Sequence, residues 1–158
     1  MKSFLINILI AATWLLLSKS PSSFQFFLGF TVGFLLMSLF PSIMESQSYT
    51  RRSLAFIRFA LMFFREFIRA NIKVAAVVLF KSKESISPNF LSYNVNGMNP
   101  VEILLLFYCI SLTPGSLTVK ISDDFQTMIL HSLDADDPEA IRKEIDRTMK
   151  VPILSFMR

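Results

Sequence analysis

The residue types that build disulfides and metal sites are almost absent from this chain. Its 158 residues include one cysteine, Cys109, and one histidine, His131. A lone cysteine cannot form an internal disulfide, and a lone histidine cannot supply a metal site without other ligands. The sequence also lacks a Walker loop and a dinucleotide-binding fingerprint. We therefore expect no cofactor and no metal, and the sequence does not indicate an enzyme.

Charge is nearly missing from the first part of the chain. Residues 3–18 and residues 20–44 carry no ionisable side chain, and their apolar cores run over 4–17 and 24–40. A membrane-spanning helix needs about 20 apolar residues. The second segment meets this requirement, whereas the first needs its flanks or could be a signal peptide. With the Ser/Pro turn at 18–23, residues 1–45 predict a hairpin of two transmembrane helices.

Two glycines give this hairpin a candidate packing face. Gly29 and Gly33 form a G-x-x-x-G pair inside the second segment. Small residues at this spacing let another helix approach closely. The alternative is that the pair is incidental, because glycine is common in membrane helices.

Positive charge follows the hairpin and indicates its orientation. The net charge is +1 over residues 1–50, +6 over 51–89 and −3 over 90–158. The turn between the two segments carries only Lys19, so the positive-inside rule places both termini in the cytoplasm. A basic segment directly after membrane spans favours a membrane surface rather than nucleic acid as its partner.

Residues 46–84 predict a basic amphipathic helix at the cytoplasmic membrane surface. Its cations recur at helical spacing and form what we call the cationic stripe: Arg51, Arg58, Arg65, Arg69 and Lys73. Phenylalanines and isoleucines fill much of the remaining circumference. An interfacial helix avoids placing these cations in lipid, although a third span remains an alternative. Glu66 is the single acid of residues 51–80, and it is either an ion-pair partner of the stripe or a carboxylate that takes part in ion coupling.

Residues 85–158 predict a small cytoplasmic α+β domain in the order β-α-β-β-α. The expected strands cover 90–95, 116–122 and 126–133, with a hairpin turn at Asp123–Asp124. An apolar run at 101–112 predicts the first helix, although 101–119 could be a further membrane segment. Asp137 and Pro138 suit the start of the last helix, whose expected buried side is Ala140, Ile141, Ile145 and Met149.

Several segments together resemble a known family. The segment Ile110–Val119 contains Thr113, Pro114 and Gly115, and His131 and Asp134 follow it further along the chain. Upstream, residues 66–71 match a Glu-x-x-x-Ala-Asn pattern. These segments resemble the E subunit of Mrp-type multisubunit Na⁺/H⁺ antiporters, with Ser111 and Ser116 where the family usually has threonine.

The resemblance implies membership of a hetero-oligomeric complex that exchanges Na⁺ for H⁺ in a prokaryotic cell membrane. The resemblance implies that the partners are other antiporter subunits and membrane lipid. In this family ion translocation is attributed to the large subunits. The absence of ionisable residues from both expected spans agrees with an accessory, multi-pass subunit. A membrane-tethered adaptor unrelated to transport is the alternative.

Overall fold

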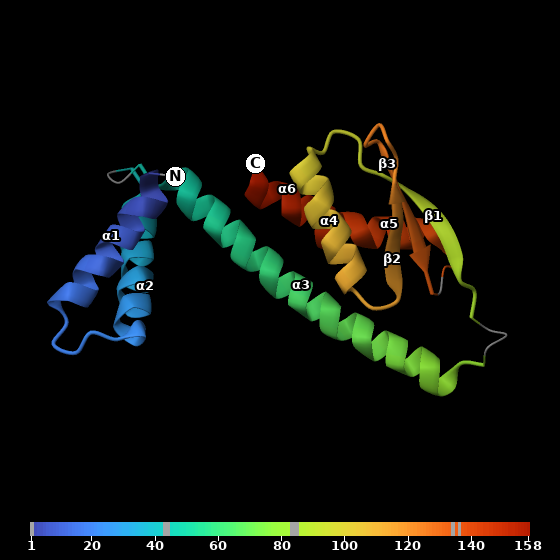
Figure 1. Cartoon of the computed structure of the whole chain (residues 1–158), viewed down its shortest axis with the longest axis horizontal. Coiled ribbons are helices and arrows are strands. Elements are labelled where there is room, and N and C mark those ends of the chain that lie inside the picture. The colour runs from blue at the N-terminus through green and yellow to red at the C-terminus, as the bar shows by residue number, and fades with distance from the viewer. Residues whose placement is uncertain (1, 43–44, 83–85, 134, 136) are drawn as a thin grey trace. The chain divides into compact units, whose positions relative to one another are not determined.

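The computed structural model describes residues 2–158 except 43–44, 83–85, 134 and 136 (Figure 1). The chain divides into two compact units, Met1–Leu54 and Ala55–Arg158. The helices and strands are, in chain order, α1 Lys2–Leu17, α2 Ser23–Leu39, α3 Gln47–Phe80, β1 Asn89–Asn94, α4 Pro100–Leu112, β2 Ser116–Ile121, β3 Thr127–Ser132, α5 Pro138–Ile145, the π-helical segment η2 Asp146–Lys150, and α6 Val151–Met157.

The first unit is built on the helical hairpin of α1 and α2. Ser22 caps α2, because its hydroxyl oxygen accepts a hydrogen bond from the Gln25 N–H at 3.3 Å. The ring of Phe4 on α1 contacts Phe30 on α2 at 6.3 Å and Tyr49 at 6.2 Å. None of the described helices is both long enough and apolar enough to count as a candidate membrane span.

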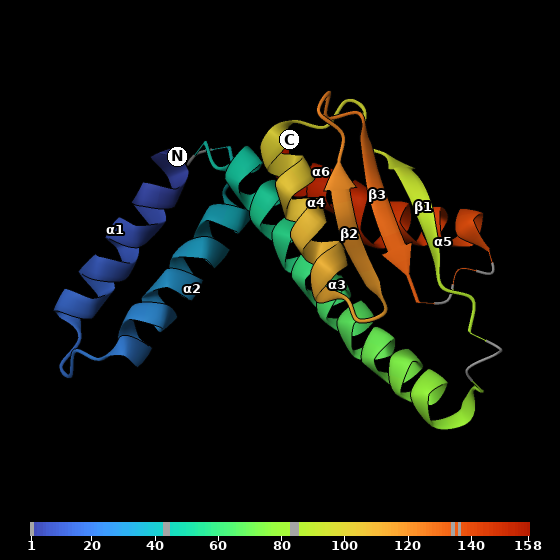
Figure 2. The same cartoon turned by 45° about the vertical axis from the view of Figure 1, so that its right-hand side comes forward.

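The second unit contains a three-stranded antiparallel sheet in the order β1-β3-β2 (Figure 2). Side chains alternate between the two faces of a strand. Leu91 and Tyr93 of β1 and Met128 and Leu130 of β3 therefore share the inner face, where they are buried in the core. The expected order of a strand, a helix, two strands and a final helix is confirmed.

Two apolar residues of β2 point to the outer face of the sheet, although an alternating strand is expected to turn its apolar side toward the core. On β2 the inward residue is Thr118, whereas Leu117 and Val119 are each 53% exposed. The register explains this, since Thr118 pairs with the buried Leu130 of β3. An irregularity between Thr118 and Lys120 then changes the alternation, and Ile121 returns to the core.

The helices that cover the inner face begin at strong local signals. Asn99 and Glu102 form a capping box at the start of α4, and Pro100 occupies the first turn. The side chain of Asp137 accepts hydrogen bonds from two N–H groups of α5, both at 3.0 Å, which confirms the expected helix start. In the final helix Ile145 and Met149 are buried as expected, but Ala140 is exposed.

Helix α3 presents two different faces within the second unit. Phe59 and Val77 are buried, and the Phe59 ring lies 5.3 Å from that of Phe156 on α6. A second row of apolar side chains recurs every three or four residues and is exposed. We call this row the outer stripe of α3: Ile57, Leu61, Phe64, Ile68 and Ile72, at 47, 68, 64, 43 and 65% exposure.

Candidate functional site

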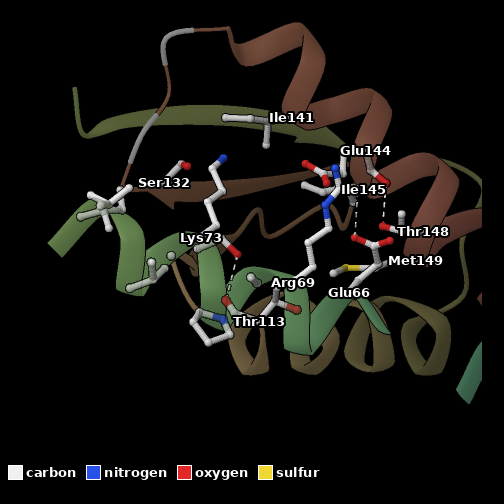
Figure 3. Close-up of a pocket in the computed structure, with 17 residues that line it drawn as sticks. Glu66, Arg69, Lys73, Thr113, Ser132, Ile141, Glu144, Ile145, Thr148 and Met149 are labelled. Atoms are coloured by element: carbon white, nitrogen blue, oxygen red, sulfur yellow. Dashed lines mark hydrogen bonds and ion pairs between the residues drawn. The ribbon is translucent and has the colours of Figure 1, made fainter. Parts of the chain in front are cut away.

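A cavity of about 440 Å³ lies inside the second unit (Figure 3). Its walls come from α3, the turn at 113–116, the end of β3, α5 and η2. These segments are far apart in the sequence, and the fold brings them together. The cavity lies within the range of roughly 300–1,000 Å³ that is usual for small-molecule sites.

Glu66 supplies the buried charge of this cavity. Its side chain is 10% exposed, and its Oε2 lies 3.7 Å from Nη1 of Arg69, whose side chain is 62% exposed. This separation permits an ion pair but is too long for a good hydrogen bond. In Figure 3 the Glu66 carboxylate points toward Thr148 and Met149 of η2. The carboxylate is therefore partly desolvated and only loosely compensated.

The cationic stripe divides into residues that line the cavity and residues that do not. All five stripe cations are exposed. Arg69 and Lys73 belong to the cavity wall, whereas Arg58 and Arg65 do not. Arg51 lies in the first unit. Figure 3 shows Lys73 extended into the cavity toward Ser132 and Ile141.

The turn of Thr113, Pro114 and Gly115 forms another wall of the cavity. Thr113 ends α4, where its N–H donates to the Ile110 carbonyl at 3.1 Å and its Oγ1 donates to the Cys109 carbonyl at 2.7 Å. Gly115 has φ +92°, a conformation that favours glycine, and a Cβ there would lie 3.1 Å from Val74 on α3. Glycine therefore permits both the turn and the close approach to α3.

His131 is near the cavity in sequence but points elsewhere. It lies on the outer face of β3, where its ring centroid is 4.9 Å from that of Phe90. The next residue, Ser132, faces inward and lines the cavity. Asp134 lies outside the described residues, as does Asp136. Within the described parts of the chain, no three His, Cys, Asp or Glu residues are grouped so that they could hold a metal ion.

Gly29 and Gly33 lie in the first unit and are both buried. A Cβ on Gly29 would be 2.6 Å from Cβ of Trp14, and one on Gly33 would be 2.3 Å from Oδ1 of Asn7. The helix that approaches this face is therefore α1. Asn7 is fully buried, and its Nδ2 donates to the Tyr49 hydroxyl at 3.0 Å.

The sequence reasoning missed an ion pair in the second unit, between the buried carboxylate of Glu102 and the exposed Arg158. Nε and Nη2 of Arg158 donate to the two carboxylate oxygens of Glu102, each at 3.0 Å. The Asn99 N–H donates to the same carboxylate at 2.8 Å. These bonds outweigh burial and hold the pKa of Glu102 below its ordinary value. The pair is 56 residues apart, so no local pattern predicts it.

Two further cavity residues also escaped the sequence reasoning. Glu144 of α5 and Thr148 of η2 line the wall that faces Glu66. Thr148 Oγ1 donates to the Glu144 carbonyl at 2.7 Å. The segment that carries Thr148 is π-helical, and such segments occur frequently at functional sites. No pattern in the sequence predicts the π-helical turn.

Comparisons with known proteins cover nearly the whole chain. Residues 7–155 match the family MNHE, described as Na⁺/H⁺ ion antiporter subunit. The chain is 32% identical over 154 residues to the E subunit of the Na⁺/H⁺ antiporter of Alkalihalophilus pseudofirmus, covering 98% of this chain and 97% of the relative. It is 33% identical to the corresponding E subunit of Bacillus subtilis over the same shares of both chains.

Solved structures share the fold. A chain of the Mrp complex from Dietzia matches with a TM-score of 0.51 and 22% identity, over 65% of this chain and 96% of that one. A chain of an archaeal membrane-bound sulfane sulfur reductase matches with a TM-score of 0.55 and 23% identity, over 96% and 99%. The sequence matches over nearly the whole chain show that the chain belongs to the MnhE family of Na⁺/H⁺ antiporter subunits, a family of transport proteins rather than enzymes.

Proposed function

We propose that this chain is an accessory subunit of an Mrp-type Na⁺/H⁺ antiporter, required for assembly and activity of the complex but not part of its ion path. The family match over residues 7–155 is the observation that carries this proposal. The relatives are named as E subunits of Na⁺/H⁺ antiporters, and they are matched over nearly their whole length.

The hairpin supports a role outside the ion path. Neither α1 after Lys2 nor α2 contains Asp, Glu, Lys, Arg or His. A proton or cation relay within a membrane normally uses ionisable side chains. The most buried polar group of the hairpin, Asn7, is engaged with Tyr49 and lies against Gly33. These contacts join α1 to α2 and to the start of α3 within the first unit.

The hairpin would anchor the chain in the cell membrane, with both termini in the cytoplasm. At 16 and 17 residues the two helices lie near the lower limit for a span. Large apolar side chains on both helices remain exposed, among them Leu9 at 66%, Leu16 at 82% and Phe27 at 66%. Lipid or partner subunits would cover this apolar surface, because contiguous exposed apolar patches are rare on soluble monomers.

Helix α3 would lie on the cytoplasmic surface of the membrane. Its inner face packs against the core of its own α+β unit through Phe59 and the partly buried Phe63. The outer stripe is exposed and is flanked by the exposed cations Arg58 and Arg65. An apolar row beside cations is the arrangement of interfacial helices, which bury the row among acyl chains and hold the cations near phosphates.

Removing the chain from the complex tests the accessory role. We expect a strain that lacks this protein to show incomplete assembly of the antiporter on native gels and reduced Na⁺/H⁺ exchange in everted membrane vesicles. Re-expression of the full chain should restore both. Full exchange by a complex without this chain would refute the proposal.

Topology can be tested separately from activity. A reporter fused after Arg158 should be accessible only from the cytoplasmic side. An external reporter would contradict the orientation without affecting the family assignment. In contrast, Glu66→Gln should leave exchange largely intact if Glu66 only pairs with Arg69; abolished exchange in an assembled complex would instead place Glu66 in the coupling machinery.

A further inference from the structure

The cavity of the second unit carries opposite charges at different depths. Glu66 forms a buried part of its wall, with a side chain that is 10% exposed, whereas Arg69 is 62% exposed. Lys73 and Glu144 complete the set of ionisable lining residues, so two cations and two carboxylates surround one space of about 440 Å³. The formal charges balance, which disfavours a simple anion or a simple cation as the ligand.

The threonine hydroxyl groups of the cavity wall present acceptors rather than donors. Thr148 Oγ1 donates its proton to the Glu144 carbonyl at 2.7 Å, and Thr113 Oγ1 donates to the Cys109 carbonyl at 2.7 Å. A hydroxyl has one proton, so the remaining lone pairs of these oxygens can only accept. Figure 3 shows Thr148 beside the Glu66 carboxylate, and these two side chains together suit a group with several N–H donors, such as a primary ammonium.

The cations of α3 that line the cavity, Arg69 and Lys73, provide its positive charge. Among the residues that the structure describes, no carboxylate lies within ion-pair distance of Lys73, and Figure 3 shows its side chain extended into the cavity. The nearby Arg69 makes a loose contact of 3.7 Å with Glu66. Arginine and lysine together are well suited to phosphate oxygens. The α3 side of the cavity therefore favours an anionic group.

We propose that this cavity binds a phosphoethanolamine group, with the ammonium at Glu66 and Thr148 and the phosphate between Arg69 and Lys73. The inference rests on the proposed function, which places the cationic stripe at the level of lipid headgroups. Arg69 and Lys73 belong both to that stripe and to the cavity wall, so we assign the group to phosphatidylethanolamine of the membrane. The site would fix the α+β unit to the membrane surface by a specific lipid.

The ligand chemistry excludes close analogues. A phosphatidylcholine headgroup has no N–H to donate to Glu66, and its methyl groups enlarge the cation. A phosphatidylglycerol headgroup has no cation, so it leaves Glu66 without a counter-charge beyond Arg69. Selectivity for a primary ammonium is therefore the signature of this site, in contrast to the general attraction of basic helices for anionic lipid.

Native mass spectrometry of the full chain in detergent can measure this selectivity. The ligands are short-chain dihexanoyl lipids with ethanolamine, choline or glycerol headgroups, and free phosphoethanolamine. We expect the ethanolamine lipid to bind wild-type protein most tightly. Glu66→Gln and Lys73→Ala should each weaken it roughly tenfold or more, because each removes a charge-assisted contact.

Arg58→Ala is the matched control, since Arg58 is an exposed cation of the same helix that does not line the cavity. It should retain the preference for the ethanolamine lipid. Equal binding of all three lipids by wild-type protein, or an unchanged preference in Lys73→Ala, would overturn the inference. Lys73 is exposed, so its replacement should leave the fold intact. Equally tight binding of free phosphoethanolamine would overturn the assignment to a membrane lipid.

These outcomes can be separated from those that test the proposed function. Full Na⁺/H⁺ exchange by a complex that lacks this chain would refute the accessory role while leaving the measured headgroup selectivity in place. Conversely, loss of selectivity in a chain that still supports assembly and exchange would remove only the lipid site.

Discussion

Replacing Gly33 with alanine tests how closely the two helices of the hairpin approach each other. The new Cβ would lie 2.3 Å from Oδ1 of Asn7 and 3.0 Å from Cγ2 of Ile10. The first distance is far inside van der Waals contact, so the Asn7 amide must turn away. That movement would break its hydrogen bond to the Tyr49 hydroxyl, which is 3.0 Å long and part-buried.

Two opposing effects decide the sign of the change. Overpacking at a close contact costs about 1–3 kcal/mol, and loss of the hydrogen bond to Tyr49 costs about 1 kcal/mol more. Alanine favours a helix over glycine by about 1 kcal/mol. The steric cost exceeds the gain in helix propensity, so we expect Gly33→Ala to destabilise the hairpin by about 1–3 kcal/mol.

Unfolding of the full chain in mixed detergent micelles can measure this change. Trp14 is the single tryptophan, and its side chain contacts Gly29 rather than Gly33, so its fluorescence reports the hairpin without a direct perturbation. Thr31→Ala, at an exposed position of α2, is the control and should stay within about 0.5 kcal/mol of wild type.

A second substitution identifies the cause. Asn7→Ala in the Gly33→Ala background removes the oxygen that clashes, so the two changes should be less than additive by about 1 kcal/mol. Unchanged or raised stability of Gly33→Ala alone would show that the helices are further apart than the structure has them.

Three more changes test the second unit. Gly115→Ala would place an alanine at φ +92° and a Cβ 3.1 Å from Val74, so thermal unfolding should show a loss of stability of about 1–2 kcal/mol. Adding Val74→Ala removes the close contact but not the backbone strain, so it should restore only part of this stability. Full rescue would exclude backbone strain as a cause. The folded-state pKa of Glu102 lies below its ordinary value of 4.5, so the stability that its carboxylate contributes is present above that pH and is lost as the pH falls through the folded pKa. Thermal unfolding of Glu102→Gln should therefore depend less on pH in this acid range, and an unchanged pH dependence would contradict the ion-pair assignment. A fluorophore at Leu61→Cys on the outer stripe should be quenched by nitroxide-labelled lipid, whereas one at Lys120→Cys should not; equal quenching would argue against an interfacial α3.

Local sequence signals are sufficient to predict the helices and strands of the α+β unit. Asp137 with Pro138 predicted the start of α5, and the structure has the expected caps there. The Asp123–Asp124 turn was expected from local chemistry, and Asp124 accepts a hydrogen bond from the Gln126 N–H at 3.1 Å. Such signals act over a few residues, which is why they can be recognised in the sequence alone.

The faces of these elements were harder to predict. On β2 the alternating apolar residues Leu117 and Val119 face outward, because pairing with β3 assigns Thr118 to the core. Periodicity shows that two faces differ, but the side that becomes buried depends on the neighbouring strand and the helices above it. Ala140 on α5 is likewise exposed, although helical periodicity predicted it to be buried.

By itself, the sequence determined the order of helices and strands, the basic character of α3 and the family resemblance, because these depend on local composition and short motifs. Only the tertiary structure joined Glu66, Lys73 and the Thr113–Gly115 turn around one cavity, and only it paired Glu102 with Arg158. It also showed that α1 occupies the Gly29 and Gly33 face. Each of these contacts joins residues distant in the chain, and their proximity follows from how whole elements pack rather than from any pattern along the sequence.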